Sequence, residues 1–362
     1  MRILLVTHSP TLTTGYGRVA AELIRGFCAA GHEVVAQGQG YGGEGHGLPC
    51  RVVPWDEGNT VAAALAEHRP DVLLTVGDPW MFEGLDRLPR AAGVRWVAYF
   101  PVDGGPVPEG WKAWLRAVDV PVTFCEWTAD LVRREAGVEA RVITHGVDVG
   151  TFRPTDKAVA KRRVGVEGKF VVGCVAANQQ RKNLPALVRA FAEFARGKED
   201  VALYLHTRID GYWDVEALVR RFGVEPKTRA TLNLDPQRGV DDATLATVYN
   251  SFDVFALPTM AEGFGLPILE AQACGVPALA TDCSACTELL PDPVQRIRVK
   301  DTLIMARNFE QAIADEGDLA GKLERLYGDR GLLAEVGRRS LAFARVPRTI
   351  ARSTRRRASA TT

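Results

Sequence analysis

The chain has 362 residues, of which 46% are hydrophobic and 25% charged, and this composition predicts a soluble globular protein of about two domains. Its formal net charge of +1 leaves no overall field that would draw it to nucleic acid or to a membrane surface. No apolar run approaches the roughly 18–20 residues of a membrane span, and the apolar start of the chain is too short for a secretory signal, so a cytoplasmic protein is expected.

Strands and helices are predicted to alternate through the first half of the chain. The expected strands lie within 2–7, 31–36, 71–76, 94–100 and 120–125, and the expected helices are 19–30 and 128–135. The loop at 8–18, after the first strand, holds Gly15 and Gly17. This strand–loop–helix–strand order predicts a doubly wound parallel sheet. A strict G-x-G-x-x-G is absent, so no dinucleotide is expected.

Polar residues follow two of these strands at the point where each strand ends. Asp78 comes after the strand at 71–76, and Asp103 comes after the strand at 94–100. Open parallel sheets bind ligands at the carboxyl ends of their strands. Both aspartates are therefore candidates for a binding site at the edge of the first sheet.

A second alternating segment follows a charged stretch at 156–169, which is expected to be a linker with a short helix. The expected strands are 170–177, 201–207, 229–234, 253–257 and 277–280, and the expected helices are 184–195, 241–250, 319–327 and 332–343. The basic pair Arg181 and Lys182 lies between a buried strand and a helix. That position favours phosphate binding over a merely solvated pair.

The stretch 258–277 carries the strongest functional pattern. A short buried strand ends before it, a loop with Gly263 and Gly265 follows, and a helix then runs to Gly275. Free backbone N–H groups and the positive end of a helix at such a loop suit a phosphate. Glu262 and Glu270 flank the loop, and carboxylates at such a place fit hydroxyl groups, which a sugar and a ribose offer.

The same stretch resembles the donor-site signature of retaining GT-B glycosyltransferases of family 4. The match consists of Glu262, seven intervening residues that include Gly-Phe-Gly-Leu-Pro, and Glu270. The resemblance implies two Rossmann-like domains that face each other across a central cleft. It also implies that Glu262 contacts the transferred sugar, that Glu270 holds the ribose, and that the loop of Gly263, Phe264, Gly265 and Leu266 faces the sugar and diphosphate.

Other residues acquire expected roles through this resemblance. Gly15 and Gly17, with Arg18, match the first loop, which lies near the donor diphosphate and the acceptor. In many family members a His follows the strand at 94–100, but Pro101 stands here, and Asp103 is expected to contribute instead.

The resemblance continues in His145-Gly-Val-Asp148 and Phe152-Arg-Pro154, which match the end of the family's first domain. His145 is expected to face the cleft. The loop that begins at Asn178 matches the donor-diphosphate loop, with Lys182 at the lysine position. The family's arginine is missing from its usual place, where Ala176 and Ala177 stand, and Arg181 is expected to supply that charge.

No metal or other cofactor is expected, because no Asp-x-Asp motif stands at a strand end. Cys283-Ser-Ala-Cys286 is a lone C-x-x-C without a second pair or a nearby His. The seven cysteines are odd in number and scattered, which favours reduced thiols. Catalysis is then expected to be electrostatic stabilisation of a departing phosphate, with Glu262, Lys182, Arg181 and Asp103 as the catalytic set.

The expected domains are 1–155 for the acceptor, 156–325 for the nucleotide-sugar donor, a helix at 326–347 that returns to the first domain, and a basic tail at 348–362. The favoured function is a glycosyltransferase with an unidentified acceptor. Three alternatives stay open: an epimerase on the same fold, a sugar-nucleotide binding protein with reduced catalysis, and a modifier of DNA or protein that docks through the tail. The oligomeric state is left open.

Overall fold

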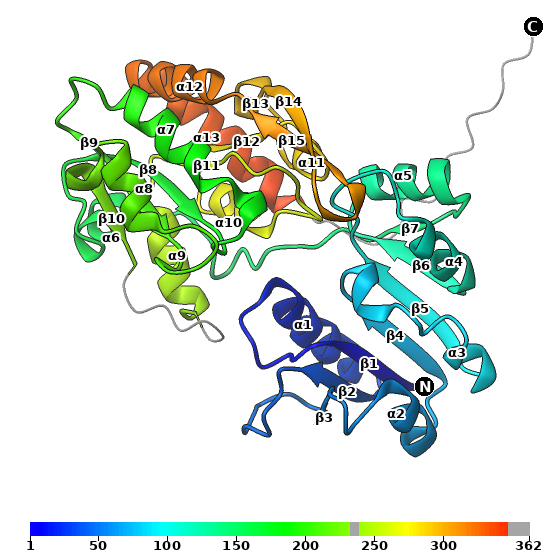
Figure 1. Cartoon of the computed structure of the whole chain (residues 1–362). Helices are drawn as coiled ribbons and strands as arrows, with labels where there is room; N and C mark the ends of the chain where they lie inside the picture. The colour runs from blue at the N-terminus through cyan, green and yellow to red at the C-terminus, as the bar shows by residue number, and fades with distance from the viewer. Residues whose placement is uncertain (232–238, 347–362) are drawn as a thin grey trace, which may run out of the picture.

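The computed structural model describes residues 1–231 and 239–346. Within them the chain forms two α/β domains, each built on a parallel sheet, and Figure 1 shows the blue-to-cyan first domain below the green-to-red second one. The turn at 235–237 and the basic tail at 348–362, with Arg352 and Arg355, Arg356 and Arg357, lie outside the described residues.

The first domain has a seven-stranded parallel sheet in the order β3-β2-β1-β4-β5-β6-β7 within the described ranges. Its strands are β1 (Arg2–His8), β2 (Glu33–Gln39), β3 (Arg51–Pro54), β4 (Val72–Val76), β5 (Arg95–Phe100), β6 (Val120–Thr123) and β7 (Arg141–Val142). Its helices are α1 (Gly15–Ala29), α2 (Val61–His68), η1 (Pro79–Phe82), α3 (Leu88–Ala91), α4 (Glu109–Ala117) and α5 (Glu126–Ala136). The predicted doubly wound sheet is confirmed.

The first helix begins earlier than predicted. We expected a loop up to residue 18, but α1 starts at Gly15 because the Thr14 hydroxyl accepts the Gly17 N–H at 3.1 Å and caps the helix. Gly17 packs so closely on the preceding loop that an added Cβ would lie 2.4 Å from the Leu12 carbonyl oxygen. Gly15, Gly17 and Arg18 therefore belong to the first turn of a helix that points at the second domain.

The second domain repeats the plan with the sheet order β10-β9-β8-β11-β12-β13, all parallel, in the part of the chain described. Its strands are β8 (Phe170–Val175), β9 (Val201–His206), β10 (Thr228–Ala230), β11 (Val254–Leu257), β12 (Ala278–Thr281) and β13 (Arg296–Ile297). Its helical elements are α6 (Lys157–Arg163), η2 (Gln180–Lys182), α7 (Leu184–Phe194), α8 (Val215–Arg221), η3 (Glu225–Lys227), α9 (Asp242–Asn250), α10 (Leu266–Ala273), α11 (Cys286–Leu289) and η4 (Pro293–Gln295).

Two helices close the described chain, α12 (Glu316–Gly328) and α13 (Arg330–Arg345). The second was expected to return to the first domain. Its main packing lies in the second domain instead, against α10 and α12. The contact with α10 is close, because an added Cβ at Gly337 would lie 2.8 Å from the Gly275 carbonyl oxygen.

A hairpin that the sequence did not predict joins the two domains. It consists of β14 (Val299–Ile304), the short η5 (Ala306–Asn308) and β15 (Glu310–Ala314), and it is drawn in orange in Figure 1. The Glu310 N–H donates to the Gly105 carbonyl at 2.5 Å, and Arg307 pairs with Glu83 at 2.9 Å. Phe309 is buried in the core of the first domain. The hairpin, which directly follows β13 of the second sheet, thus links the second domain to the first.

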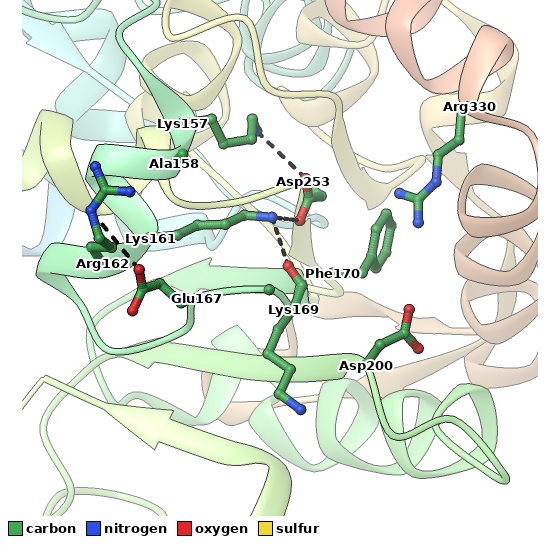
Figure 2. Close-up of a pocket in the computed structure, with 11 residues that line it drawn as sticks. Lys157, Ala158, Lys161, Arg162, Glu167, Lys169, Phe170, Asp200, Asp253 and Arg330 are labelled. Atoms are coloured by element: carbon green, nitrogen blue, oxygen red, sulfur yellow. Dashed lines mark hydrogen bonds and ion pairs between the residues drawn. The ribbon is translucent and has the colours of Figure 1, made fainter.

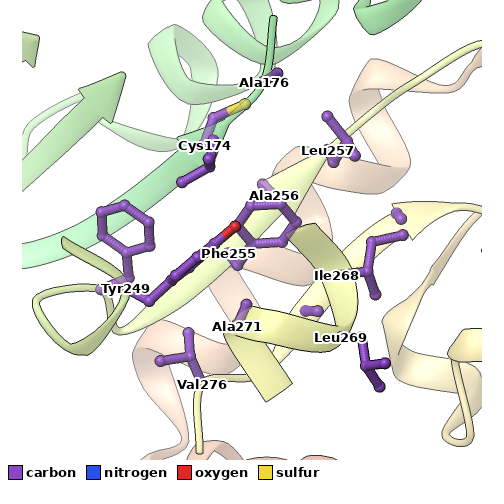
Figure 3. Packing of buried hydrophobic residues seen from close by; sticks show 14 of the residues in the cluster. Cys174, Ala176, Tyr249, Phe255, Ala256, Leu257, Ile268, Leu269, Ala271 and Val276 are labelled. Carbon is purple, nitrogen blue, oxygen red and sulfur yellow. The ribbon is translucent and has the colours of Figure 1, made fainter. Parts of the chain in front are cut away.

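The core of the second domain forms where β11 lies under α10. Figure 3 shows Phe255 and Leu257 of the strand beside Ile268 and Leu269 of the helix, all of them fully buried. Since β11 is buried on both faces, its sequence is an unbroken apolar run without alternation. This packing fixes the loop between β11 and α10, which carries Glu262.

Gly173, in the middle of β8, leaves no room for a side chain. An added Cβ would lie 2.2 Å from ring atoms of the fully buried Phe252. We expect Gly173→Ala to lower the free energy of unfolding, measured in urea, by about 3 kcal/mol, because the ring cannot move without disturbing the core. Gly26→Ala in α1 is the control. Nothing lies within 4 Å of its added Cβ, so it should raise stability by about 0.5–1 kcal/mol. Equal stability of the two variants would contradict the packing argument.

Candidate active site

Three charged side chains, two of them buried (Lys182 and Glu262), form a cluster at the carboxyl edge of the second sheet. The Lys182 Nζ lies 2.5 Å from the Glu262 Oε1, and the Arg181 Nη1 lies 3.0 Å from the Glu262 Oε2. Lys182 ends η2, directly before α7, and Glu262 follows β11, so neighbouring strands deliver the two loops. The predicted catalytic residues Glu262, Lys182 and Arg181 are therefore in contact.

The charges of this cluster hold one another in place. Burial alone would raise the pKa of Glu262, but Lys182 and Arg181 outweigh it and lower that pKa to about 2. Burial and the neighbouring Arg181 lower the pKa of Lys182 below its ordinary value. The stability that comes from ionised Glu262 is complete above the ordinary glutamate pKa and is lost as the pH falls toward 2. Glu262 thus pairs with both cations but balances only one of their two positive charges.

The first domain contributes two aspartates beside this cluster. Asp103, after β5, lies 3.7 Å from the Arg181 Nε, and Asp78, after β4, forms a hydrogen bond with Tyr16 of α1. Burial and the charge of Asp103 raise the pKa of Asp78 to about 6. The two domains therefore bring Asp103 beside Arg181, and its catalytic role stays a prediction.

Asp78 gives a pH dependence with a defined sign. Its pKa is raised in the folded state, so the folded protein loses stability as the pH rises from about 4 to about 6, and the loss persists above that range. We expect Asp78→Asn, which keeps the shape without the charge, to be more stable than the parent at pH 7 by about 1–3 kcal/mol. Thermal unfolding between pH 4 and pH 8 measures this, and the difference between the two proteins should vanish near pH 4. If the difference in stability between the two proteins does not change with pH, the pKa of Asp78 is not raised by burial.

The loop at 263–266 reaches the first domain through close backbone contacts. An added Cβ at Gly263 would lie 2.5 Å from the Pro101 Cβ, and one at Gly15 would lie 4.0 Å from a methyl group of Leu266. Gly265 has φ +101°, which favours glycine at the residue that precedes α10. The predicted donor loop and the first turn of α1 therefore face each other at the junction of the domains.

His145 lies within this junction rather than open to it. Its ring lies 4.8 Å from that of Phe264 and 4.2 Å from that of Phe124, and its Nδ1 is 2.9 Å from the Tyr99 hydroxyl. Burial lowers the pKa of His145 to about 3, so the imidazole is neutral at ordinary pH. It contributes shape and a neutral polar edge to the site, not a charge.

Glu270 is held by two residues to which the sequence analysis assigned no contact with it. The Arg18 Nη1 donates to its Oε1 at 2.6 Å, and the Tyr249 hydroxyl donates to its Oε2 at 2.8 Å. Arg18 also lies 3.3 Å from Asp242. Tyr249 has the spacing of a core residue in the sequence of α9, and nothing in that sequence indicates where its hydroxyl points. Glu270 thus carries an ion pair across the domain junction.

Asn178 does not join the cluster. Its side-chain amide donates to the carbonyls of Arg208 and Trp213 at 3.0 and 2.8 Å, and its oxygen accepts the Trp213 N–H at 2.9 Å. An added Cβ at Gly211 would collide with it. The side chain therefore fixes the loop after β9. The expected contact of Asn178 with the donor stays a prediction.

A cavity of about 540 Å³ lies elsewhere, at the amino edge of the second sheet (Figure 2). Its charges are largely paired with one another: Lys161 lies 2.6 Å and Lys157 3.8 Å from Asp253, and Arg162 lies 3.9 Å from Glu167. These pairs indicate a network that secures α6 to the start of β11. The cavity is distant from the strand ends that carry Glu262.

Among the residues that the structure describes, no three His, Cys, Asp or Glu side chains gather closely enough to bind a metal ion. None of the helices in that part of the chain combines the length and apolar character that a membrane crossing requires.

Residues 169–328 match the family model of Glycosyl transferases group 1. A D-inositol 3-phosphate glycosyltransferase of Segniliparus rotundus is 34% identical over 163 residues, which are 44% of this chain and 35% of that protein. The chain thus spans about a third of the length of this relative. The match to the family model lies in the second domain, around the Lys182–Glu262 cluster.

Solved structures resemble the whole chain. Sucrose-phosphate synthase of Thermosynechococcus elongatus has a TM-score of 0.75 at 17% identity. The superposition covers 95% of this chain and 94% of the synthase chain. The Anabaena protein Alr3699/HepE, solved with UDP and glucose, has a TM-score of 0.74 at 17% identity with the same coverage. At such identities the likeness establishes the fold alone. The predicted GT-B architecture of two Rossmann-like domains is confirmed.

Proposed function

We propose that this protein is a retaining glycosyltransferase that moves a sugar from a nucleoside diphosphate sugar to an acceptor hydroxyl. The observation that carries the proposal is the contact of Lys182 and Arg181 with Glu262 at the strand ends of the second domain. It is supported by the match of residues 169–328, which include this cluster, to the group 1 glycosyltransferases.

Donor binding would exchange the partners within this cluster. Lys182 and Arg181 would turn from Glu262 to the diphosphate, whose two phosphates offer more negative charge than one carboxylate. Glu262 would then accept hydrogen bonds from hydroxyls of the transferred sugar. Fixed cations that face the leaving diphosphate lower the barrier most when water is excluded, and burial of Lys182 and Glu262 provides that exclusion.

The donor loop and Glu270 would complete the site. The amides of Gly263, Phe264 and Gly265 precede α10 and would face the sugar and diphosphate. Glu270 would receive the ribose hydroxyls, and for this Arg18 must share or release its carboxylate. UDP-glucose is the first donor to test, because Alr3699/HepE, which has the same fold, was solved with UDP and glucose.

We propose no resident metal for this reaction, since Lys182 and Arg181 supply the positive charge that a metal would bring to the diphosphate. The acceptor is left unassigned. The relatives are named for D-inositol 3-phosphate, but the chain spans only about a third to a half of their length, so that acceptor is one member of the panel to test.

A panel of nucleotide sugars, incubated with the protein and chelator but without acceptor, tests the proposal. We expect slow release of the nucleoside diphosphate from one donor, and no release with Glu262→Gln. Release of an epimerised nucleotide sugar would replace the proposal by an epimerase. Tight binding without turnover of any donor, with or without acceptors, would replace it by a binding protein.

A further inference from the structure

The lone C-x-x-C forms a closed turn in the folded protein. Cys283 and Cys286 are both free thiols, and the Cys286 N–H donates to the Cys283 carbonyl at 3.0 Å. A turn closed in this way keeps its first and last Cα atoms within about 7 Å. A disulfide requires Cα atoms roughly 4.4–6.8 Å apart. The backbone therefore holds the two cysteines at a separation from which a disulfide can form.

The two thiols differ in their access to solvent. Cys283 is partly exposed, whereas Cys286 is fully buried. A hydrogen bond with Cys283, together with burial, raises the pKa of Cys286 well above its ordinary value. A reagent in solution can therefore reach the Cys283 thiol but not the buried Cys286 thiol.

This turn supports the backbone that carries Glu262. The Cys283 thiol donates to the Met260 carbonyl at 3.5 Å, and the hydroxyl of Ser284 accepts the Glu262 N–H at 2.9 Å. Ser284 has φ +46°, an uncommon conformation for a residue with a side chain. A change in the turn therefore reaches the Glu262 N–H directly through Ser284, and the Met260 carbonyl, two residues earlier in the same loop, through Cys283.

We propose that Cys283 and Cys286 are an oxidation site at which a low-molecular-weight disulfide, such as oxidised glutathione, reversibly displaces Glu262. The Cys283 thiolate attacks one sulfur of the reagent and releases the first thiolate. The Cys286 thiolate then attacks the Cys283 sulfur and releases the second. The protein loses two electrons and two protons, and the reagent is reduced to two thiols.

The displacement follows from the geometry of the new bond. Two bonded sulfurs lie about 2.05 Å apart, so the Cys283 sulfur moves toward Cys286 and away from the Met260 carbonyl. It also loses the proton that it donated there. Since Ser284 lies between the two cysteines, its hydroxyl moves with the turn, and the Glu262 N–H loses its acceptor.

The test uses the full-length protein incubated with oxidised glutathione. We expect intact mass and peptide mapping to show a Cys283–Cys286 disulfide that dithiothreitol reverses. The Glu262 amide should exchange its hydrogen faster in the oxidised form. The rate of nucleotide-sugar hydrolysis should fall about tenfold or more, because small displacements of catalytic groups have large effects.

Matched variants separate this site from other cysteines. Cys283→Ser keeps a donor toward Met260 and should resist oxidation with its rate intact, and Cys286→Ala should resist as well. Cys28→Ser is the control. Cys28 lies near Cys50, so this variant tests whether that second pair is responsible, and it should remain sensitive like the parent.

Three outcomes would overturn the proposal: a stable mixed disulfide at Cys283 without ring closure, a Cys283–Cys286 disulfide that leaves the Glu262 amide and the rate unchanged, or equal sensitivity of Cys283→Ser. The effect on the rate rests on the proposed function, but disulfide mapping and amide exchange do not. If the protein hydrolyses no nucleotide sugar, those two measurements still decide whether the oxidation site exists.

Discussion

Replacing Lys182 with alanine is expected to lower the rate of nucleotide-sugar hydrolysis by about 10²–10³-fold, the effect of removing one preorganised donor from a leaving group. The reason is the position of its Nζ, which lies 2.5 Å from Glu262 and is the most deeply buried cation of the cluster. Arg181 remains in this variant and still neutralises Glu262, so the protein should fold. Steady-state rates and urea unfolding, measured on the same samples, separate the two effects.

Lys161→Ala is the matched control, because Lys161 also forms a largely buried ion pair, at 2.6 Å with Asp253 (Figure 2). It should lower the free energy of unfolding, on the order of 3 kcal/mol, and leave the rate per folded molecule unchanged. The double change Lys182→Ala with Glu262→Gln should recover stability without recovering activity. The proposed role of Lys182 fails if its variant keeps the parent rate, or if Lys161→Ala loses as much activity.

A methyl group at Gly263 is expected to reduce activity by about 10²-fold while the protein stays folded. The added Cβ would lie 2.5 Å from the Pro101 Cβ, so the donor loop or the edge of the first sheet must shift. Displacement by about 1 Å of a loop that positions substrate has effects of this size. Rates at saturating donor, compared with thermal unfolding, measure the effect.

Two further variants make this prediction specific. Pro101→Gly removes the atoms against which the new methyl group would press, so Gly263→Ala combined with Pro101→Gly should recover most of the lost activity. Gly146→Ala is the control, because Gly146 follows His145 of the domain junction in the chain. Nothing lies within 4 Å of its added Cβ, so this variant should have the activity of the parent. If the double variant is no more active than Gly263→Ala alone, contact between the two domains is not the cause.

The local pattern of residues was sufficient to predict most secondary structure. Apolar runs predicted β8, β9 and β11 to within about two residues, because strands buried on both faces leave an uninterrupted signal. The hairpin at Val299–Ala314 was missed, because most of β14 is exposed and its contacts with Gly105 and Glu83 are supplied by the other domain. No pattern within the segment itself encodes those partners.

The site was predicted as a set of residues but not as a set of contacts. Glu262, Lys182 and Arg181 stood out because each follows a buried strand, where parallel sheets gather their polar residues. The Glu270 contacts could not be foreseen in this way, since Arg18 lies 252 residues away in sequence. The position of Asn178 depends equally on the loop at 208–213, which folds back onto it.

The sequence by itself determined the two doubly wound sheets and the strand ends at which charged side chains collect, because hydrophobic periodicity and glycine placement act over a few residues. Only the tertiary structure decided which charges meet, which are buried and which way their pKa values shift. Burial and pairing depend on groups that only folding brings together. The neutral imidazole of His145 and the ion pair of Arg18 with Glu270 arise where the two domains meet, and the contact of Cys283 with Met260 arises within the second domain.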